Sequence, residues 1–190
     1  MAWITVRHRA RFFFAVSGTV LLLAGCGTHA GSSSSPPTRA PGIAGLDGAA
    51  LLARLEDRGG YVCEGPEPAA STRQRWTCIS EPADRSLAPR VEVIVKGASL
   101  QAVDSVDVTV DLAGVIAGDF VAQTTLTYIV DATALPDDAR TAARTLVTTP
   151  SEDGQVDLPG LTMYLTGGQS LRRLELVHNH FDERSAPFGK

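Results

Sequence analysis

Two stretches in the middle of the chain alternate apolar and polar residues with a period of two. The apolar positions in these stretches are Val91, Val93, Val95, Val106, Val108, Val110 and Leu112. In an extended strand every second side chain lies on the same face, so each stretch predicts a strand with one buried face. Gly97-Ala98-Ser99 lies between them and predicts a turn that makes the two strands antiparallel.

Two further hairpins are predicted on either side of this pair. Residues 61–65 and 74–80 have the composition of short strands, and their pairing would set Cys63 opposite Cys78. Residues 161–166 and 171–177 flank Gly167-Gly168, a dipeptide typical of hairpin turns. The sequence therefore predicts about six strands in an antiparallel sheet.

Two helices are predicted from caps and apolar spacing. Asp47 suits the N-cap of a helix that runs to Arg58, and Gly59-Gly60 suits its end. A second helix begins at Pro136-Asp137-Asp138, where a proline and two carboxylates favour a first turn. Their apolar stripes are Leu51, Leu52 and Leu55 in the first helix, and Ala139, Ala143, Leu146 and Val147 in the second.

Residues 115–132 fit two patterns. A helix would gather Val121, Ala122, Leu126, Tyr128, Ile129 and Val130 on one face, with Phe120 out of place. A strand would set Phe120, Leu126, Tyr128 and Val130 on one face, and the Thr and Val content favours it. We predict a helix because the segment is long and its apolar residues cluster in angle.

The predicted fold class is α+β, with the sheet of about six strands packed against about three helices. Residues 46–178 make this single domain, and residues 179–190 form a polar tail.

The first 25 residues have the features of a secretory signal. Arg7, Arg9 and Arg11 precede an apolar run over residues 12–23 that is too short to span about 30 Å of hydrocarbon as a helix. Leu23-Ala24-Gly25-Cys26 resembles the lipobox of bacterial lipoproteins, and the layout of the chain is similar to that of small actinobacterial lipoproteins.

The resemblance implies that residues 1–25 are removed and that Cys26 receives a lipid. The expected location is the extracytoplasmic face of the cell membrane, with the lipid as the anchor. Residues 26–45 contain this cysteine and a Gly-, Ser- and Pro-rich linker, which is either a plain flexible spacer or an O-glycosylated stalk.

Removal of the signal takes three arginines and no acidic residue, which moves the formal net charge from −4 to −7. An acidic domain argues against nucleic acid as a partner and against electrostatic binding to anionic lipid. The sequence suggests no cofactor, and it leaves the oligomeric state open.

Cys63 and Cys78 form an even pair in a chain expected to be exported, which predicts a structural disulfide. The alternative is a reactive or metal-binding pair of thiols. Trp76 shares the face of Cys78 by the strand period, so it is expected beside the disulfide in the core, or else as a surface for ligand stacking.

His178 and His180 are weak candidates for a metal site, because side chains two residues apart on a strand share a face. The alternative is a solvated strand end. Asp104, Asp107 and Asp111 lie on one predicted strand, where Asp107 and Asp111 are about 13 Å apart and too distant to act on one bond. They are expected to keep the outer face of the sheet wet.

The sequence contains no nucleophile motif or phosphate loop, so we expect a binding or interaction module for an unknown protein or small molecule. One alternative is a carrier of a lipid or other apolar ligand, which requires a large cavity. Another is a hydrolase with an unrecognised acidic site, which requires a pocket that joins two carboxylates to a histidine.

Overall fold

The computed structural model describes residues 42–69, 73–149 and 153–179, all within one compact unit that spans residues 38–190. Its elements in chain order are α1 (Gly48–Gly59), β1 (Val62–Pro68), β2 (Gln74–Ser80), β3 (Arg90–Ser99), β4 (Ala102–Asp111), α2 (Gly118–Ala132), α3 (Asp137–Thr148), β5 (Gly154–Leu158), β6 (Leu161–Gly168) and β7 (Leu171–Val177). The predicted α+β class is confirmed, with seven strands in place of about six.

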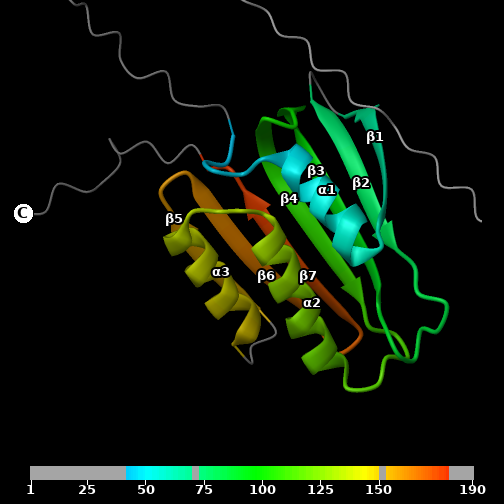
Figure 1. The fold of residues 1–190 in the computed structure, drawn as a ribbon. Coiled ribbons are helices and arrows are strands. Elements are labelled where there is room, and N and C mark those ends of the chain that lie inside the picture. Colours follow the sequence, from blue (N-terminus) through cyan, green and yellow to red (C-terminus); the bar gives the residue numbers. More distant parts are fainter. Residues whose placement is uncertain (1–41, 70–72, 150–152, 180–190) are drawn as a thin grey trace, which may run out of the picture. The chain divides into compact units, whose positions relative to one another are not determined.

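The seven strands form one antiparallel sheet in the order β1-β2-β3-β4-β7-β6-β5. All three helices lie on the same face of this sheet, as Figure 1 shows. The apolar residues of the alternating strands point to the helices, so Val93 and Val108 are fully buried. The polar residues of the same strands line the face that no helix covers.

Both glycine turns were predicted in the wrong place. Strand β3 continues through Gly97 to Ser99, and the turn is Leu100-Gln101. Strand β6 continues through Gly167 and Gly168, and the turn is Gln169-Ser170. A Cβ at Gly97 would lie 2.1 Å from the carbonyl oxygen of Ala102, and one at Gly167 would lie 2.2 Å from that of Leu171. These glycines are therefore required by the close approach of the partner strand.

The helix predictions hold. The Asp47 side chain accepts hydrogen bonds from the backbone N–H groups of Ala49 and Ala50, and Gly60 ends α1 with a left-handed backbone. The ambiguous segment forms helix α2 from Gly118 onward, whereas residues 115–117, which were predicted to be helical, belong to the preceding loop. Phe120 is indeed out of place, with 70% of its surface exposed.

The packed chain begins before the predicted boundary at residue 46. Ile43 is 5% exposed within the core, and its N–H donates to the carbonyl of Val103 at 2.8 Å. Gly42 approaches the backbone of Val103 so closely that a Cβ would lie 2.6 Å from the carbonyl oxygen. Residues 42–45, which were expected to belong to the linker, are thus part of the folded unit. Cys26 and residues 180–190 lie outside the described residues.

Among the described residues, no helix has both the length and the apolar character needed to cross a bilayer.

Candidate functional site

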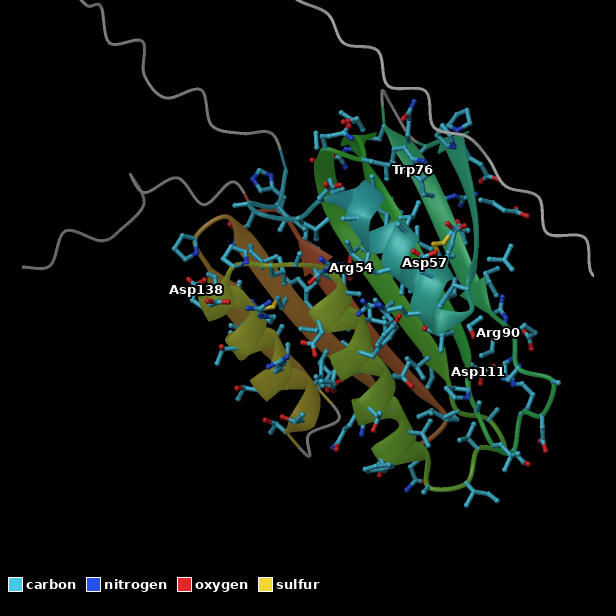
Figure 2. The ribbon with its side chains drawn as sticks, in the orientation of Figure 1. Arg54, Asp57, Trp76, Arg90, Asp111 and Asp138 are labelled. Carbon is cyan, nitrogen blue, oxygen red and sulfur yellow. A yellow bond between two sulfur atoms is a disulfide. The ribbon has the colours of Figure 1, made fainter. Side chains whose placement is uncertain are left out.

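The two cysteines are structural. Cys63 and Cys78 pair across β1 and β2 and form the predicted disulfide. Cys78 is fully buried and Trp76 is 6% exposed, so the tryptophan of β2 belongs to the core (Figure 2). The core position confirms the first of the two roles considered for Trp76 and leaves it no free surface for ligand stacking.

The weak metal candidates are not brought into a donor cluster. His178 follows the end of β7, where its N–H donates to the carbonyl of Asp104 at 2.7 Å. His180 lies outside the described residues. Within the described part of the chain, no group of three or more His, Cys, Asp or Glu side chains is placed to hold a metal ion.

Each aspartate of β4 has its own arginine. Asp104 pairs with Arg73 at 3.0 Å, Asp107 pairs with Arg173, and Asp111 pairs with Arg85 at 2.6 Å. The expectation of a wet surface is wrong for Asp107, which is 9% exposed. The neighbouring strand β7 sets Arg173 beside it, and the guanidinium takes the place of water. The carboxylates are thus separately neutralised, which is a structural arrangement.

Three exposed apolar residues lie on neighbouring segments at one end of the sheet. Leu87 and Ile116 are each 72% exposed, and Phe120 is 70% exposed, although the domain has a well-filled core. The N–H of Ile116 donates to the carbonyl of Ser86 at 3.1 Å, which joins the loop before α2 to the loop before β3. Phe120 lies in the first turn of α2, four residues after Ile116. We call Leu87, Ile116 and Phe120 the apolar tip.

Charged residues hold the loops of the apolar tip in place. Asp84 accepts hydrogen bonds from the N–H and the hydroxyl of Ser86, which lower the pKa of its carboxyl. The Asp111 carboxyl also has a lowered pKa, because it accepts from the N–H of Ala113 and from Arg85. Figure 2 shows Asp111 at this end of the sheet. These contacts hold the β2–β3 loop and the loop before α2 in place. They do not cover the apolar side chains of the tip.

A hollow of about 370 Å³ begins beside the apolar tip. It is lined by Arg58, Gly59, Tyr61, Ser80, Ala88, Pro89, Val91, Thr124, Thr125 and Tyr128. Ala88 and Pro89 directly follow Leu87, and Thr124 is one helical turn beyond Phe120, to whose carbonyl its hydroxyl donates at 2.9 Å. We call this space the phenol hollow, after its two tyrosines.

Gly59 allows the two tyrosines to approach each other. A Cβ at this position would lie 2.6 Å from the ring of Tyr61 and 3.1 Å from the hydroxyl of Tyr128. Burial, and to a smaller extent Tyr128, raise the pKa of Tyr61 to about 12. The Tyr61 phenol therefore stays protonated and able to donate a hydrogen bond at any physiological pH.

Helices α1 and α2 are tied together beside this hollow. The Tyr128 hydroxyl donates to the carbonyl of Arg54 at 3.1 Å, and the Arg54 guanidinium donates to the carbonyl of Ala132 at 3.0 Å. A second hollow, of about 420 Å³, lies between the same helices and shares Arg58 and Tyr128 with the first. Arg54 and Asp57 line it, and Figure 2 shows both on α1.

The apolar tip and the phenol hollow were not predicted from the sequence. Phe120 carried a signal, because it fell outside the apolar face of its helix. Leu87 carried none, since it is an isolated apolar residue in a turn-rich stretch. Ile116 carried none either, because it lies between Val115 and Ala117 in a segment that was predicted to be helical. The tyrosines lie 67 positions apart in the chain, so only the fold brings them together.

No protein-family profile, no curated protein sequence and no solved structure matches this chain.

Proposed function

We propose that this protein is a lipid-anchored interaction module on the extracytoplasmic face of the membrane, which binds a protein partner through the apolar tip. The observation that carries the proposal is the exposure of Leu87, Ile116 and Phe120, each at 70% or more. Large apolar side chains gathered on neighbouring exposed segments favour contact with a partner, which removes them from water.

The surroundings of the tip favour a protein over a membrane as its partner. The arginines of the β2–β3 segment that carries Leu87 are already paired, as Arg85 with Asp111 and Glu81, and Arg90 with Glu81. Asp84 adds a negative charge at its edge. Anionic lipid attracts unpaired Lys and Arg and repels such a rim. An apolar centre within a polar rim is the arrangement of protein–protein interfaces.

Two features support the proposed location. The resemblance of Leu23-Ala24-Gly25-Cys26 to a lipobox implies an anchor at Cys26. The Cys63–Cys78 disulfide is of the kind that persists in oxidising, extracytoplasmic compartments.

The alternatives have less support in the described residues. A carrier needs a large cavity between helices and sheet, but that layer is filled by side chains with no more than 1% exposure, such as Leu51, Leu126 and Val106. A hydrolase needs a functional acid pair. The hollow between α1 and α2 holds Asp57 and Asp131 without a histidine, and Asp131 pairs with Arg144 at 2.7 Å.

The test is site-specific photo-crosslinking of the full chain in its own membranes. A photoreactive residue at Ile116 is expected to give one protein adduct of defined mass, and the additional substitution Phe120→Ser should remove most of it. Val62 is the matched control position, because it is apolar and 67% exposed but lies on the edge strand β1.

The proposal fails if the probe at Val62 captures the same protein as the probe at Ile116. It also fails if the adduct at Ile116 is lipid, or if Phe120→Ser leaves the protein adduct unchanged while the variant melts like the parent chain.

A further inference from the structure

The charges around the phenol hollow are unbalanced. Among the described residues that line it, Arg58 is charged and none is acidic. No ion pair or hydrogen bond of the Arg58 side chain involves another described residue, in contrast to the paired arginines Arg54, Arg85, Arg90 and Arg144. The hollow thus presents one guanidinium that is free to bind an anion, and Arg binds carboxylates with two parallel hydrogen bonds.

Tyr61 adds a hydrogen-bond donor to the hollow. The residue is only 7% exposed, and it lines the hollow. Its hydroxyl is not among the buried polar atoms that lack a partner, so it is accessible from the hollow and can donate to a ligand there. Because burial keeps this phenol protonated, it is a donor, which again suits an anionic oxygen.

The rest of the lining is suited to a small ring. Ala88, Pro89 and Val91 give an apolar wall, and the half-buried Tyr128 adds an aromatic ring. A volume of about 370 Å³ falls within the usual range of small-molecule sites, which is roughly 300–1,000 Å³. Ser80 and Thr125 supply hydroxyl groups for further hydrogen bonds.

We propose that the phenol hollow is a binding site for a small carboxylic acid with an apolar ring, in which Arg58 binds the carboxylate, Tyr61 donates to it and the ring lies on the apolar wall. This site is separate from the apolar tip, and a small molecule bound there needs no contact with Leu87, Ile116 or Phe120.

Arg58 also has a structural role to be distinguished, since a cation in the last turn of α1 interacts favourably with the negative end of the helix. A purely structural arginine would affect melting and leave ligand binding unchanged. Ligand affinity is therefore the readout that separates the two roles.

The test uses benzoate and its neutral isostere benzamide as probes. Both are titrated by saturation-transfer NMR against the full chain in phosphatidylcholine nanodiscs, with empty nanodiscs as the blank. Benzoate is expected to bind saturably, with benzamide at least tenfold weaker. Arg58→Gln should weaken benzoate at least tenfold and Tyr61→Phe several-fold. Arg140→Gln, which removes an arginine paired with Asp137 on α3, is the matched control and should bind as the parent does.

Absence of saturable benzoate binding overturns the proposal, and so does equal binding of the two probes. Benzoate affinity that is unchanged by Arg58→Gln or by Tyr61→Phe, in variants that melt cooperatively, overturns it as well. None of these results bears on the apolar tip, because the crosslinking experiment does not depend on the hollow.

Discussion

The buried phenol of Tyr61 makes stability depend on alkaline pH. In the unfolded chain a tyrosine ionises near pH 10, but in the folded protein Tyr61 stays protonated up to about pH 12. The unfolded state therefore loses its proton first, and the free energy of unfolding should fall between pH 10 and 12 by at most about 1.4 kcal/mol per pH unit.

Tyr61→Phe removes the ionising group, so its free energy of unfolding should fall less over this range. Urea unfolding of both chains at a series of alkaline pH values checks this. Parallel pH profiles would show that Tyr61 ionises as easily in the folded protein as in the unfolded chain.

Ile43 belongs to the core although it precedes the predicted boundary at residue 46. Because its side chain is buried, Ile43→Ala should lower the free energy of unfolding by about 2–4 kcal/mol. Ala44→Ser changes the exposed neighbour and should have almost no effect. Chemical denaturation of the two variants measures the difference. Equal stability would restore the sequence-based boundary at residue 46.

The glycines show which residue-level features the sequence leaves open. Gly97 and Gly167 were interpreted as turn residues because glycine favours turns, but each lies in a strand against the backbone of its neighbour. Turn chemistry is local and visible in sequence, whereas a close approach depends on a partner strand. Ile43 was missed for a similar reason, since one apolar residue within a Gly- and Pro-rich segment has no periodicity to reveal it.

At the level of elements, the disulfide holds the edge strand β1 to the sheet. It closes a loop between cysteines 15 residues apart, for which the chain-entropy estimate is about 3 kcal/mol. Replacement of both cysteines by alanine should lower the free energy of unfolding by about 2–4 kcal/mol, measured by denaturant titration. Peptide mapping under non-reducing conditions provides the control, and two free thiols in the natural protein would contradict the pairing.

Elements with strong periodicity or good caps were predictable, and β5 was not. Residues 91–96 and 106–112 alternate without interruption, and Asp47 and Gly60 delimit α1. Strand β5 has only five residues, begins with Gly154 and has half-buried apolar positions, so its sequence resembles a loop. Residues 154–158 form a strand because they pair with β6, and a pairing with another strand cannot be read from their own sequence.

At the level of the whole molecule, the proposed lipid anchor at Cys26 would define where the apolar tip acts. Cys26→Ala should move the protein from the detergent phase to the aqueous phase in a phase-partition assay, or leave a precursor with its signal attached. The reason is that no other membrane attachment is expected for a domain with net negative charge. Unchanged partitioning together with unchanged mass would exclude lipidation at this residue.

The distribution of chemistry explains why the sequence carries a motif for location and none for function. The resemblance to a lipobox rests on four consecutive residues, and consecutive residues can be recognised without knowledge of the fold. The apolar tip and the phenol hollow each collect residues from separate segments. The β2–β3 loop and helix α2 contribute to both, the loop before α2 adds Ile116 to the tip, and the end of α1 adds Arg58 to the hollow. Such surfaces exist only once the sheet has set those segments side by side.

Strand β4 links the two ends of the domain, and this placement decides how the domain would resist a pulling force. Residues 42–43 join the sheet at Val103, near the start of β4, and the loops of the tip contact its last residue, Asp111. Ten residues of strand separate these ends by about 30 Å. A pull between a tethered N-terminus and a partner held at the tip acts along the strands. The hydrogen bonds of β4 to β3 and β7 are perpendicular to that direction. A force along β4 therefore loads all of these hydrogen bonds at once, and they must break together before the strands slide apart.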